Sequence, residues 1–311
     1  KAVKEYTYIY KTNPTQFKQY SNFGKALVMA KDYDNAIIAL ERAIQKNSND
    51  VQAHANLAIA YSNTKQTDKA LVQYEKALSL NPDLHLLRLD YAHLLADLNK
   101  NDEAIAQYNL YLKANPNDAL AHFNLGLMYQ RKQNLSAAID EFNTVIKLDP
   151  TNNDAKKELA RTYHVAKDYN RALTLYNELL KNQKDDAELF YNTALAYHSL
   201  KNYDKAAELY KKSLAIKKDK TVERDLAQAY IGKGNAYALS KQYEKAIECY
   251  ENALAYDPKE FYALSGLANA YQKLGKGDKA VENYEKAIAQ NPSNKDLFLA
   301  FGNTLSKFKK L

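Results

Sequence analysis

The chain has 311 residues, of which only 8 are Gly and 6 are Pro. So little turn-forming chemistry excludes a fold of many short strands and favours a helical one. The net charge is +7, but basic and acidic residues alternate along the chain and form no continuous basic stripe. This pattern disfavours nucleic acid as a partner. No apolar run is long enough for direct membrane insertion, and the single cysteine, Cys249, leaves the cellular compartment open.

A proline preceded by Asn or Asp recurs every 34 residues at Pro82, Pro116 and Pro150, and two more such prolines, Pro258 and Pro292, are again 34 residues apart. This spacing predicts a repeated unit that ends two residues after the proline. In chain order, we expect the second helix of an incomplete repeat at 1–16, six repeats at 17–220, an insertion at 221–226 that lengthens the following helix, two repeats at 227–294, and at 295–311 the first helix of a further repeat or a cap.

Two positions of the repeat accept only small residues. The twentieth position is always alanine: Ala36, Ala70, Ala104, Ala138, Ala172, Ala206, Ala246 and Ala280. The eighth is always glycine or alanine: Gly24, Ala58, Ala92, Gly126, Ala160, Ala194, Gly234 and Ala268. Small residues on facing helices allow two backbones to approach closely. Each repeat is therefore predicted to be a tight antiparallel helix pair, with its tyrosines filling the surrounding core.

Polar residues mark where the helices should begin. A short polar residue stands two residues before the alanine at the twentieth position in most repeats, and we expect each to cap a second helix. These residues are Asp34, Asp68, Asp102, Ser136, Asn170, Asp204 and Asp278. Asp50 and Asp118 follow the proline turn and should cap first helices.

These features resemble the tetratricopeptide repeat: a small eighth residue, an aromatic eleventh, alanine at the twentieth position, an aromatic twenty-fourth and a late proline. The resemblance covers almost the whole chain. It implies an all-α fold, a right-handed superhelical solenoid of antiparallel helix pairs, in which the first helices line a concave groove.

The sixth position should face that groove. It is occupied by Asn22, Asn56, Asp90, Asn124, Glu158 and Asn192, and then by Gly232, Gly266 and Ala300. An asparagine amide can both donate to and accept from the backbone of an extended peptide. The column is similar to the asparagine ladder that holds substrate peptides in protein O-glycosyltransferases with such repeats. Asparagine is also common at this position across the family. Two interpretations therefore remain open: a peptide-binding ladder, or a residue preference of the family that has no role in binding.

Other groove positions offer further candidates for peptide binding. Leu89, Phe123, Tyr191 and Ile231 occupy the fifth position and are predicted to be exposed apolar anchors. Arg161, Asn235 and Asn269 occupy the ninth. Lys157, Arg161 and Asn192 imitate part of the set that grips a terminal carboxylate in chaperone-binding members of the family. The next repeat has Gln228 and Gly232 where that set requires basic residues, which disfavours this interpretation.

Catalytic and metal-binding patterns are not found. The sequence has no glycine-rich phosphate loop, no nucleophile elbow and no HExxH spacing. His164 and His198 share a position in adjacent repeats, but helix spacing places them too far apart for one metal ion without a third ligand. His54 and His122 stand in a packing position and are expected in the core. The sequence therefore predicts no enzyme activity, no cofactor and no metal.

Departures from the repeat pattern gather around residues 193–233. Thr193 and Lys233 replace an apolar residue, Ser213 replaces a small apolar one, and Lys218 replaces the proline, next to the insertion. Two interpretations remain open: a partial hinge in this region, or a harmlessly extended helix with Lys233 reaching water.

We expect a protein-interaction scaffold that binds a protein or peptide segment in the groove. One alternative is a substrate-recruiting arm of a larger enzyme such as a protein glycosyltransferase. Another is a structural scaffold that self-associates through its ends.

Overall fold

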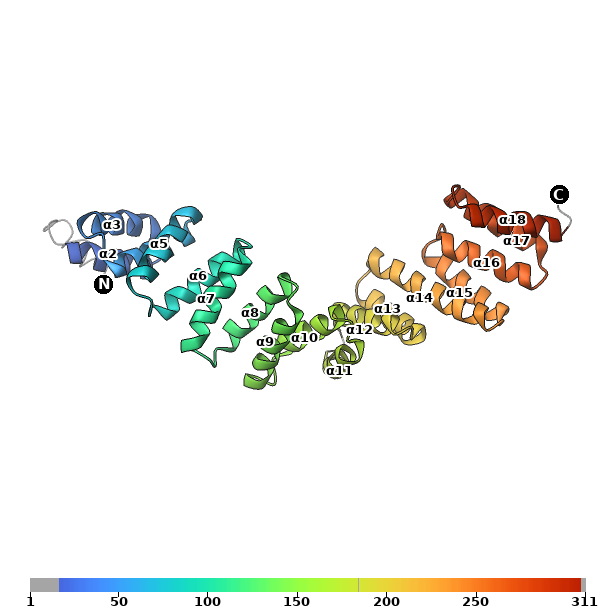
Figure 1. The fold of residues 1–311 in the computed structure, drawn as a ribbon, viewed down its shortest axis with the longest axis horizontal. Coiled ribbons are helices and arrows are strands. Elements are labelled where there is room, and N and C mark those ends of the chain that lie inside the picture. Colours follow the sequence, from blue (N-terminus) through green and yellow to red (C-terminus); the bar gives the residue numbers. More distant parts are fainter. Residues whose placement is uncertain (1–16, 184, 309–311) are drawn as a thin grey trace. The chain divides into compact units, whose positions relative to one another are not determined.

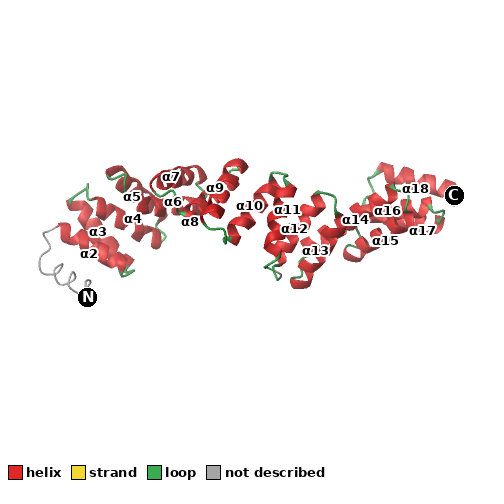
Figure 2. Cartoon of the chain, turned by 90° about the horizontal axis from the view of Figure 1, so that it is seen from below, coloured by secondary structure: helices red, strands yellow, loops and turns green. Residues whose placement is uncertain are grey.

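The computed structural model describes residues 17–183 and 185–308, and all the regular structure in them is helical (Figure 1). The first helices of the repeats are α2 (Phe17–Met29), α4 (Val51–Asn63), α6 (His85–Asp97), α8 (Ala119–Arg131), α10 (Asn153–Val165), α12 (Ala187–Ser199), α14 (Lys220–Leu239), α16 (Phe261–Lys273) and α18 (Lys295–Lys307). The second helices are α3 (Tyr33–Lys46), α5 (Thr67–Leu80), α7 (Asn101–Ala114), α9 (Leu135–Leu148), α11 (Tyr169–Leu180), α13 (Tyr203–Ile216), α15 (Tyr243–Tyr256) and α17 (Gly277–Gln290). Short loops join them (Figure 2).

The described residues form two compact units, 17–152 with α2 to α9 and 153–308 with α10 to α18. In each unit every helix packs mainly on the helices that precede and follow it in the chain. A smaller number of contacts join successive first helices, for example α4 with α6 and α14 with α16. Each unit is thus a solenoid of antiparallel helix pairs, as the sequence predicted.

The core is built on the twentieth and twenty-fourth positions. All eight alanines at the twentieth position are fully buried. The largest fully buried side chains at the twenty-fourth are Tyr74, Tyr108, Phe142, Tyr176, Tyr210, Tyr250 and Tyr284. Their rings lie against the eighth position of the partner helix: a Cβ added to Gly126 would come within 2.7 Å of the Phe142 ring, and one added to Gly234 within 2.7 Å of the Tyr250 ring. The predicted close approach of the two helices is therefore observed.

The predicted caps of the first helices are confirmed, because Asp50 and Asp118 accept hydrogen bonds of 3.0 Å from the amides of Ala53 and Ala121. The prediction for the second helices was wrong by two residues. Their N-cap positions are Asp32, Gln66, Lys100, Asn134, Asp168, Asn202, Gln242 and Lys276. Residues such as Asp34 and Asp68 lie in the first helical turn. There an acidic side chain is favoured by the positive end of the helix dipole, which produces the same residue preference.

The turn from first to second helix is equally regular. It places a residue in the left-handed region at Lys31, Lys65, Asn99, Gln133, Lys167, Lys201 and Lys241, with φ between 58° and 62°, and at Gly275 with φ of 75°. Only glycine adopts this conformation without steric cost, so seven of these turns carry backbone strain of about 1 kcal/mol each.

Helix α14 runs unbroken through the predicted insertion. Val222 and Leu226 from the inserted segment are buried in the core of the second unit. The polar residues that depart from the repeat pattern here are hydrogen-bonded. Thr193 Oγ1 donates to the Leu189 carbonyl at 2.7 Å, and Ser213 Oγ donates to the Ala187 carbonyl at 2.8 Å. Lys233 pairs with Asp204 at 2.5 Å. This packing favours the extended helix over a hinge.

The fourth position of the repeat carries a recurring polar bridge in the first unit. His54 Nδ1 lies 2.6 Å from Gln73 Oε1, and His54 Nε2 lies 3.0 Å from the Ser48 carbonyl oxygen. Arg88 and His122 make the equivalent two contacts in the next repeats. His54 is buried and His122 half-buried, so both histidines belong to the packing between repeats, as expected.

Candidate functional site

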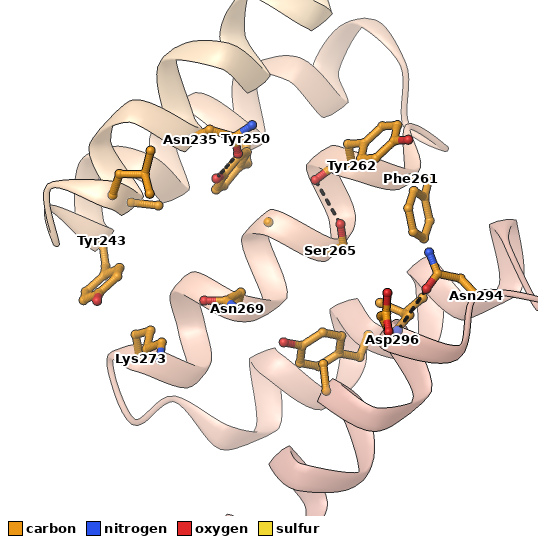
Figure 3. Close-up of a pocket in the computed structure, with 16 residues that line it drawn as sticks. Asn235, Tyr243, Tyr250, Phe261, Tyr262, Ser265, Asn269, Lys273, Asn294 and Asp296 are labelled. Carbon is orange, nitrogen blue, oxygen red and sulfur yellow. Dashed lines mark hydrogen bonds between the residues drawn. The ribbon is translucent and has the colours of Figure 1, made fainter.

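A trough of about 600 Å³ is hollowed along α16, between α14 and α18 of the second unit (Figure 3). We call it the α16 trough. It is lined by Asn235, Ala238, Leu239, Tyr243, Tyr250, Phe261, Tyr262, Ser265, Gly266, Asn269, Lys273, Tyr284, Asn294, Asp296, Leu297 and Ala300. Many of these residues occupy the second, fifth, sixth, ninth and thirteenth positions of first helices. The fifth, sixth and ninth of these were assigned to the groove from the sequence.

Capping side chains set where two of the helices begin. Glu260 accepts a hydrogen bond from the Tyr262 amide at the start of α16, and Asn294 accepts one of 3.1 Å from the Leu297 amide at the start of α18. Each cap satisfies a backbone donor that the helix itself leaves free. The caps therefore set the first turns of α16 and α18, on which Tyr262 and Asp296 stand.

Small residues at the sixth position form the floor of the trough. Gly266 leaves room for the ring of Tyr250, whose Cζ would lie 2.6 Å from a Cβ at that position. Ala300 is the equivalent residue on α18. Because neither residue projects a long side chain, the buried rings of Tyr250 and Tyr284 reach the trough surface. The floor is therefore apolar and aromatic.

Polar groups stand along and around this floor. The Tyr250 hydroxyl donates a hydrogen bond of 2.7 Å to Asn235 Oδ1. Burial raises the pKa of Tyr250 to about 12, so this hydroxyl keeps its proton at physiological pH. Asn269 lies farther along α16. With its Oδ1 occupied, Asn235 retains its amide N–H groups as donors, and Asn269 can both donate and accept.

The two ends of the trough differ in charge. Lys273 and Tyr243 lie at one end, and Phe261, Tyr262 and Asp296 lie at the other (Figure 3). Within the described ranges, Lys273 and Asp296 form no ion pair with the protein. Both charges thus remain available to a ligand.

In the first unit, the sixth-position residues partly engage the protein itself. Asn56 Nδ2 donates to the Gln52 carbonyl of its own helix at 2.8 Å. Asn124 Nδ2 lies 3.2 Å from His93 Nε2 on the preceding first helix. Asn22 and Asp90 are exposed, although the protein atoms crowded around Asp90 raise the pKa of its carboxyl by desolvation. An asparagine ladder in this unit stays a prediction.

In the second unit, the first two residues at the sixth position are Glu158 and Asn192. Glu158 accepts a hydrogen bond of 3.0 Å from Arg161, and Asn192 is half-buried. Lys157 Nζ lies 2.6 Å from Asp186 Oδ2, so this lysine is already paired and cannot grip a carboxylate without breaking that bond. The pairing agrees with the sequence argument against a chaperone-type clamp.

The fifth-position candidates are less exposed than expected. Leu89, Phe123 and Tyr191 are half-buried; the Phe123 ring packs 5.7 Å from Phe142, and the Tyr191 hydroxyl donates to Asp225 at 2.8 Å. For Ile231 the prediction of an exposed anchor was wrong. It is only 4% exposed and belongs to the buried core of the second unit.

The histidine pair is used in packing. His164 lies edge-on to Tyr169, and His198 lies edge-on to Tyr203 and Tyr210. Burial lowers the pKa of both imidazoles. In the described part of the chain, no group of three or more His, Cys, Asp or Glu is arranged to hold a metal ion.

The sequence singled out Asn235 and Asn269 in this trough but not the aromatic residues that line it. Tyr243 and Phe261 begin α15 and α16, outside the groove positions, and Leu239 ends α14 with 87% of its surface exposed. A signal was present in the replacement of asparagine by Gly232, Gly266 and Ala300, since loss of side chains at a groove position deepens the groove.

No helix among the described residues is both long and apolar enough to cross a membrane. Comparison with curated proteins gives no match. Among solved structures, the chain is similar to a tetratricopeptide repeat protein from Parabacteroides merdae, with 19% identity over 82% of this chain and 98% of that one and a TM-score of 0.52. It is also similar to MamA AMB-1, with 23% identity over 54% of this chain and 92% of that one and a TM-score of 0.51. At this identity the likeness shows the fold.

Models of the tetratricopeptide repeat match at residues 51–84, 89–153, 157–221 and 261–294, and a further TPR repeat model matches at 234–275. These matches cover most of the chain and coincide with the helix pairs described above. The chain belongs to the tetratricopeptide repeat superfamily.

Proposed function

We propose that the chain is a protein-interaction scaffold that holds an extended segment of a partner protein against its first helices. The observation that carries this proposal is the α16 trough, which is lined by groove positions of three successive first helices. It combines an apolar floor with asparagine amides, a lysine and an aspartate. That combination suits a peptide, whose backbone needs hydrogen-bond partners and whose side chains need separate pockets.

Exposed apolar surface supports the same function. Leu239 is 87% exposed and Tyr262 is 64% exposed, at the margins of the trough. Large apolar side chains that flank a hollow gain free energy when a ligand covers them. The two asparagines fix the orientation of the ligand backbone, while the apolar surface supplies the affinity.

The experiment is selection of binders from a random peptide library by the whole chain, followed by affinity measurements on a plugged variant. Ser265→Tyr places a large side chain in the trough at the fifth position, where other repeats carry Leu89, Phe123 and Tyr191, so the fold tolerates it. We expect the selected peptides to lose at least about tenfold in affinity, since about 1.4 kcal/mol of contacts would be blocked.

The matched control is Ala289→Tyr, which adds the same side chain at an exposed site of α17 outside the trough. It should leave affinity unchanged, and thermal unfolding should show that both variants are folded. Selected peptides that bind the plugged variant as tightly as the original chain would overturn the proposal.

The asparagine column is tested in the same assay. Replacing Asn56, Asn124 and Asn192 with alanine should weaken a ladder-bound peptide by about 1 kcal/mol per residue, the usual net value of a hydrogen bond. Unchanged affinity in the triple variant, together with loss in Ser265→Tyr, would confine peptide binding to the trough.

A further inference from the structure

We propose that the α16 trough selects a peptide segment in which one apolar side chain lies between an acidic and a basic residue, with alternate residues facing the protein. The acidic group pairs with Lys273, the apolar side chain rests over Gly266, and the basic group lies between Tyr262 and Asp296. This proposal rests on the proposed function and specifies the ligand.

The Lys273 end selects the acidic group. Lys273 occupies the thirteenth position at the end of α16, and the equivalent residue of α14 is the exposed Leu239. Lys307, at the same position of α18, directs its Nζ to the Gln272 carbonyl at 3.4 Å, so a second positive charge lies near the end of α16. The free ammonium of Lys273 is therefore the natural partner of a ligand carboxylate.

The opposite end selects a basic group. Phe261 and Tyr262 pack edge to face with ring centroids 5.1 Å apart, and Tyr262 is 64% exposed. Asp296, at the second position of α18, lies at the same end (Figure 3). An aromatic face beside an unpaired carboxylate suits the long side chain of lysine or arginine, which can pack its carbon chain on the ring and direct its charge to the acid.

The centre selects an apolar side chain. Gly266 and Ala300 leave the space above Tyr250 and Tyr284 unfilled, with Leu297 beside it. In the repeat at 51–84 the sixth position carries Asn56 instead, which would occupy this space. A side chain of the size of leucine or phenylalanine can rest on this apolar floor, and its burial supplies the apolar part of the binding free energy.

The length of the trough sets the spacing of these three groups. Tyr262 and Lys273 are eleven residues apart on one helix, or about 16 Å at a rise of about 1.5 Å per residue. An extended peptide advances about 3.3 Å per residue, so five residues span about 13 Å between their first and last Cα atoms, and long charged side chains at the two ends cover the remainder. Alternate side chains of an extended chain point the same way. The first, third and fifth residues therefore face the protein, and they carry the acidic, apolar and basic groups.

The test uses two fluorescent peptides of eleven residues that differ only in the order of charge, with Glu-Gly-Phe-Gly-Lys or Lys-Gly-Phe-Gly-Glu at their centres. The fixed charges of the trough and the side-chain amides of Asn235 and Asn269 should make the original chain prefer one of them by about tenfold or more in anisotropy titrations. Replacing the central phenylalanine with alanine should weaken the preferred peptide by at least a similar factor.

The decisive variant is the double exchange Lys273→Glu with Asp296→Lys, which reverses the charges at the two ends. It should invert the preference between the two peptides. Lys147→Glu repeats one of the two charge reversals on the first unit, where Lys147 is exposed, and should leave the preference unaltered. Inversion is a readout that a merely destabilised protein would not give.

The outcomes separate the two proposals. If Ser265→Tyr abolishes binding but the double exchange does not invert the preference, the trough binds peptides and the charge assignment is wrong. If neither peptide binds the original chain at millimolar concentration, the assignment is wrong as well. If library-selected peptides ignore Ser265→Tyr, the proposed function itself fails.

Discussion

Tyr250 donates a hydrogen bond of 2.7 Å from its hydroxyl to Oδ1 of Asn235, and this contact joins the core of the second unit to its binding surface. The ring of Tyr250 is buried, whereas Asn235 is exposed in the trough. Tyr176 holds the same position in an earlier repeat, but its buried hydroxyl has no hydrogen-bond partner among the described residues.

This difference predicts opposite results for two identical substitutions. Tyr250→Phe should lower the free energy of unfolding by about 1 kcal/mol, because it removes one hydrogen bond and keeps the ring. Tyr176→Phe should cost nothing or add stability, because it removes a buried polar group without a partner. Urea denaturation of the two variants measures both values, and equal losses would contradict the prediction.

Two glycines at the eighth position predict another contrast. Gly302 in α18 has no atom of the described residues within 4 Å of an added Cβ, whereas a Cβ on Gly126 would meet the Phe142 ring at 2.7 Å. Gly302→Ala should raise the free energy of unfolding by about 0.5 to 1 kcal/mol, the helix preference of alanine over glycine. Gly126→Ala should lower it by about 1 kcal/mol or more through overpacking. Thermal denaturation of the two variants gives the signs, and stabilisation by both substitutions would show that the Phe142 ring moves at little cost.

The raised pKa of Asp90 predicts a stability that depends on pH. A carboxyl whose pKa is higher in the folded than in the unfolded chain favours folding when protonated, and this contribution is lost as the pH rises through its pKa. Asp90→Asn should therefore stabilise the chain at pH 7, by less than about 1 kcal/mol because water reaches the site. The gain should disappear below pH 3.

The control for Asp90→Asn is Asp140→Asn, at an exposed site of α9. Urea denaturation at the two pH values measures the effect. A gain of equal size at both values would mean that the amide stabilises through contacts of its own rather than through the loss of charge.

Burial across the inserted segment predicts that α14 is as stable as its neighbours. Val222 and Leu226 are buried, and Tyr191 donates a hydrogen bond to Asp225 from α12. Backbone amides of residues 213–233 should therefore be protected from hydrogen exchange to the same degree as those of the flanking helices. Faster exchange confined to this segment would restore the hinge interpretation.

The packing of the helix pairs could be predicted because it depends on residue size at fixed spacing. The alanines at the twentieth position, with glycine or alanine at the eighth, admit only one kind of close contact, and the structure has it. Helix caps were harder, since an acidic residue is favoured both at the cap and in the first turn. Asp34 was misplaced for that reason.

The trough was less predictable because it depends on residues that share no repeat position. Tyr243 begins a second helix and Phe261 begins a first one, yet both line the same hollow. Ile231 was also misjudged: it lies on the lengthened α14 and is buried in the same core as Val222 and Leu226 of the inserted segment. Helical periodicity gives the facing of a residue within one regular repeat, but it does not describe how an irregular helix alters its neighbours.

The local nature of the contacts in each unit has a consequence for folding. Because helices pack mainly on their neighbours in the chain, few distant segments must meet before contacts form. Chains with such low contact order fold in microseconds to milliseconds, and in repeat arrays folding can begin at any hairpin and spread. Helices α14 to α18 should then be able to keep the trough formed while hairpins elsewhere open, so a ligand bound there would survive partial unfolding of the chain.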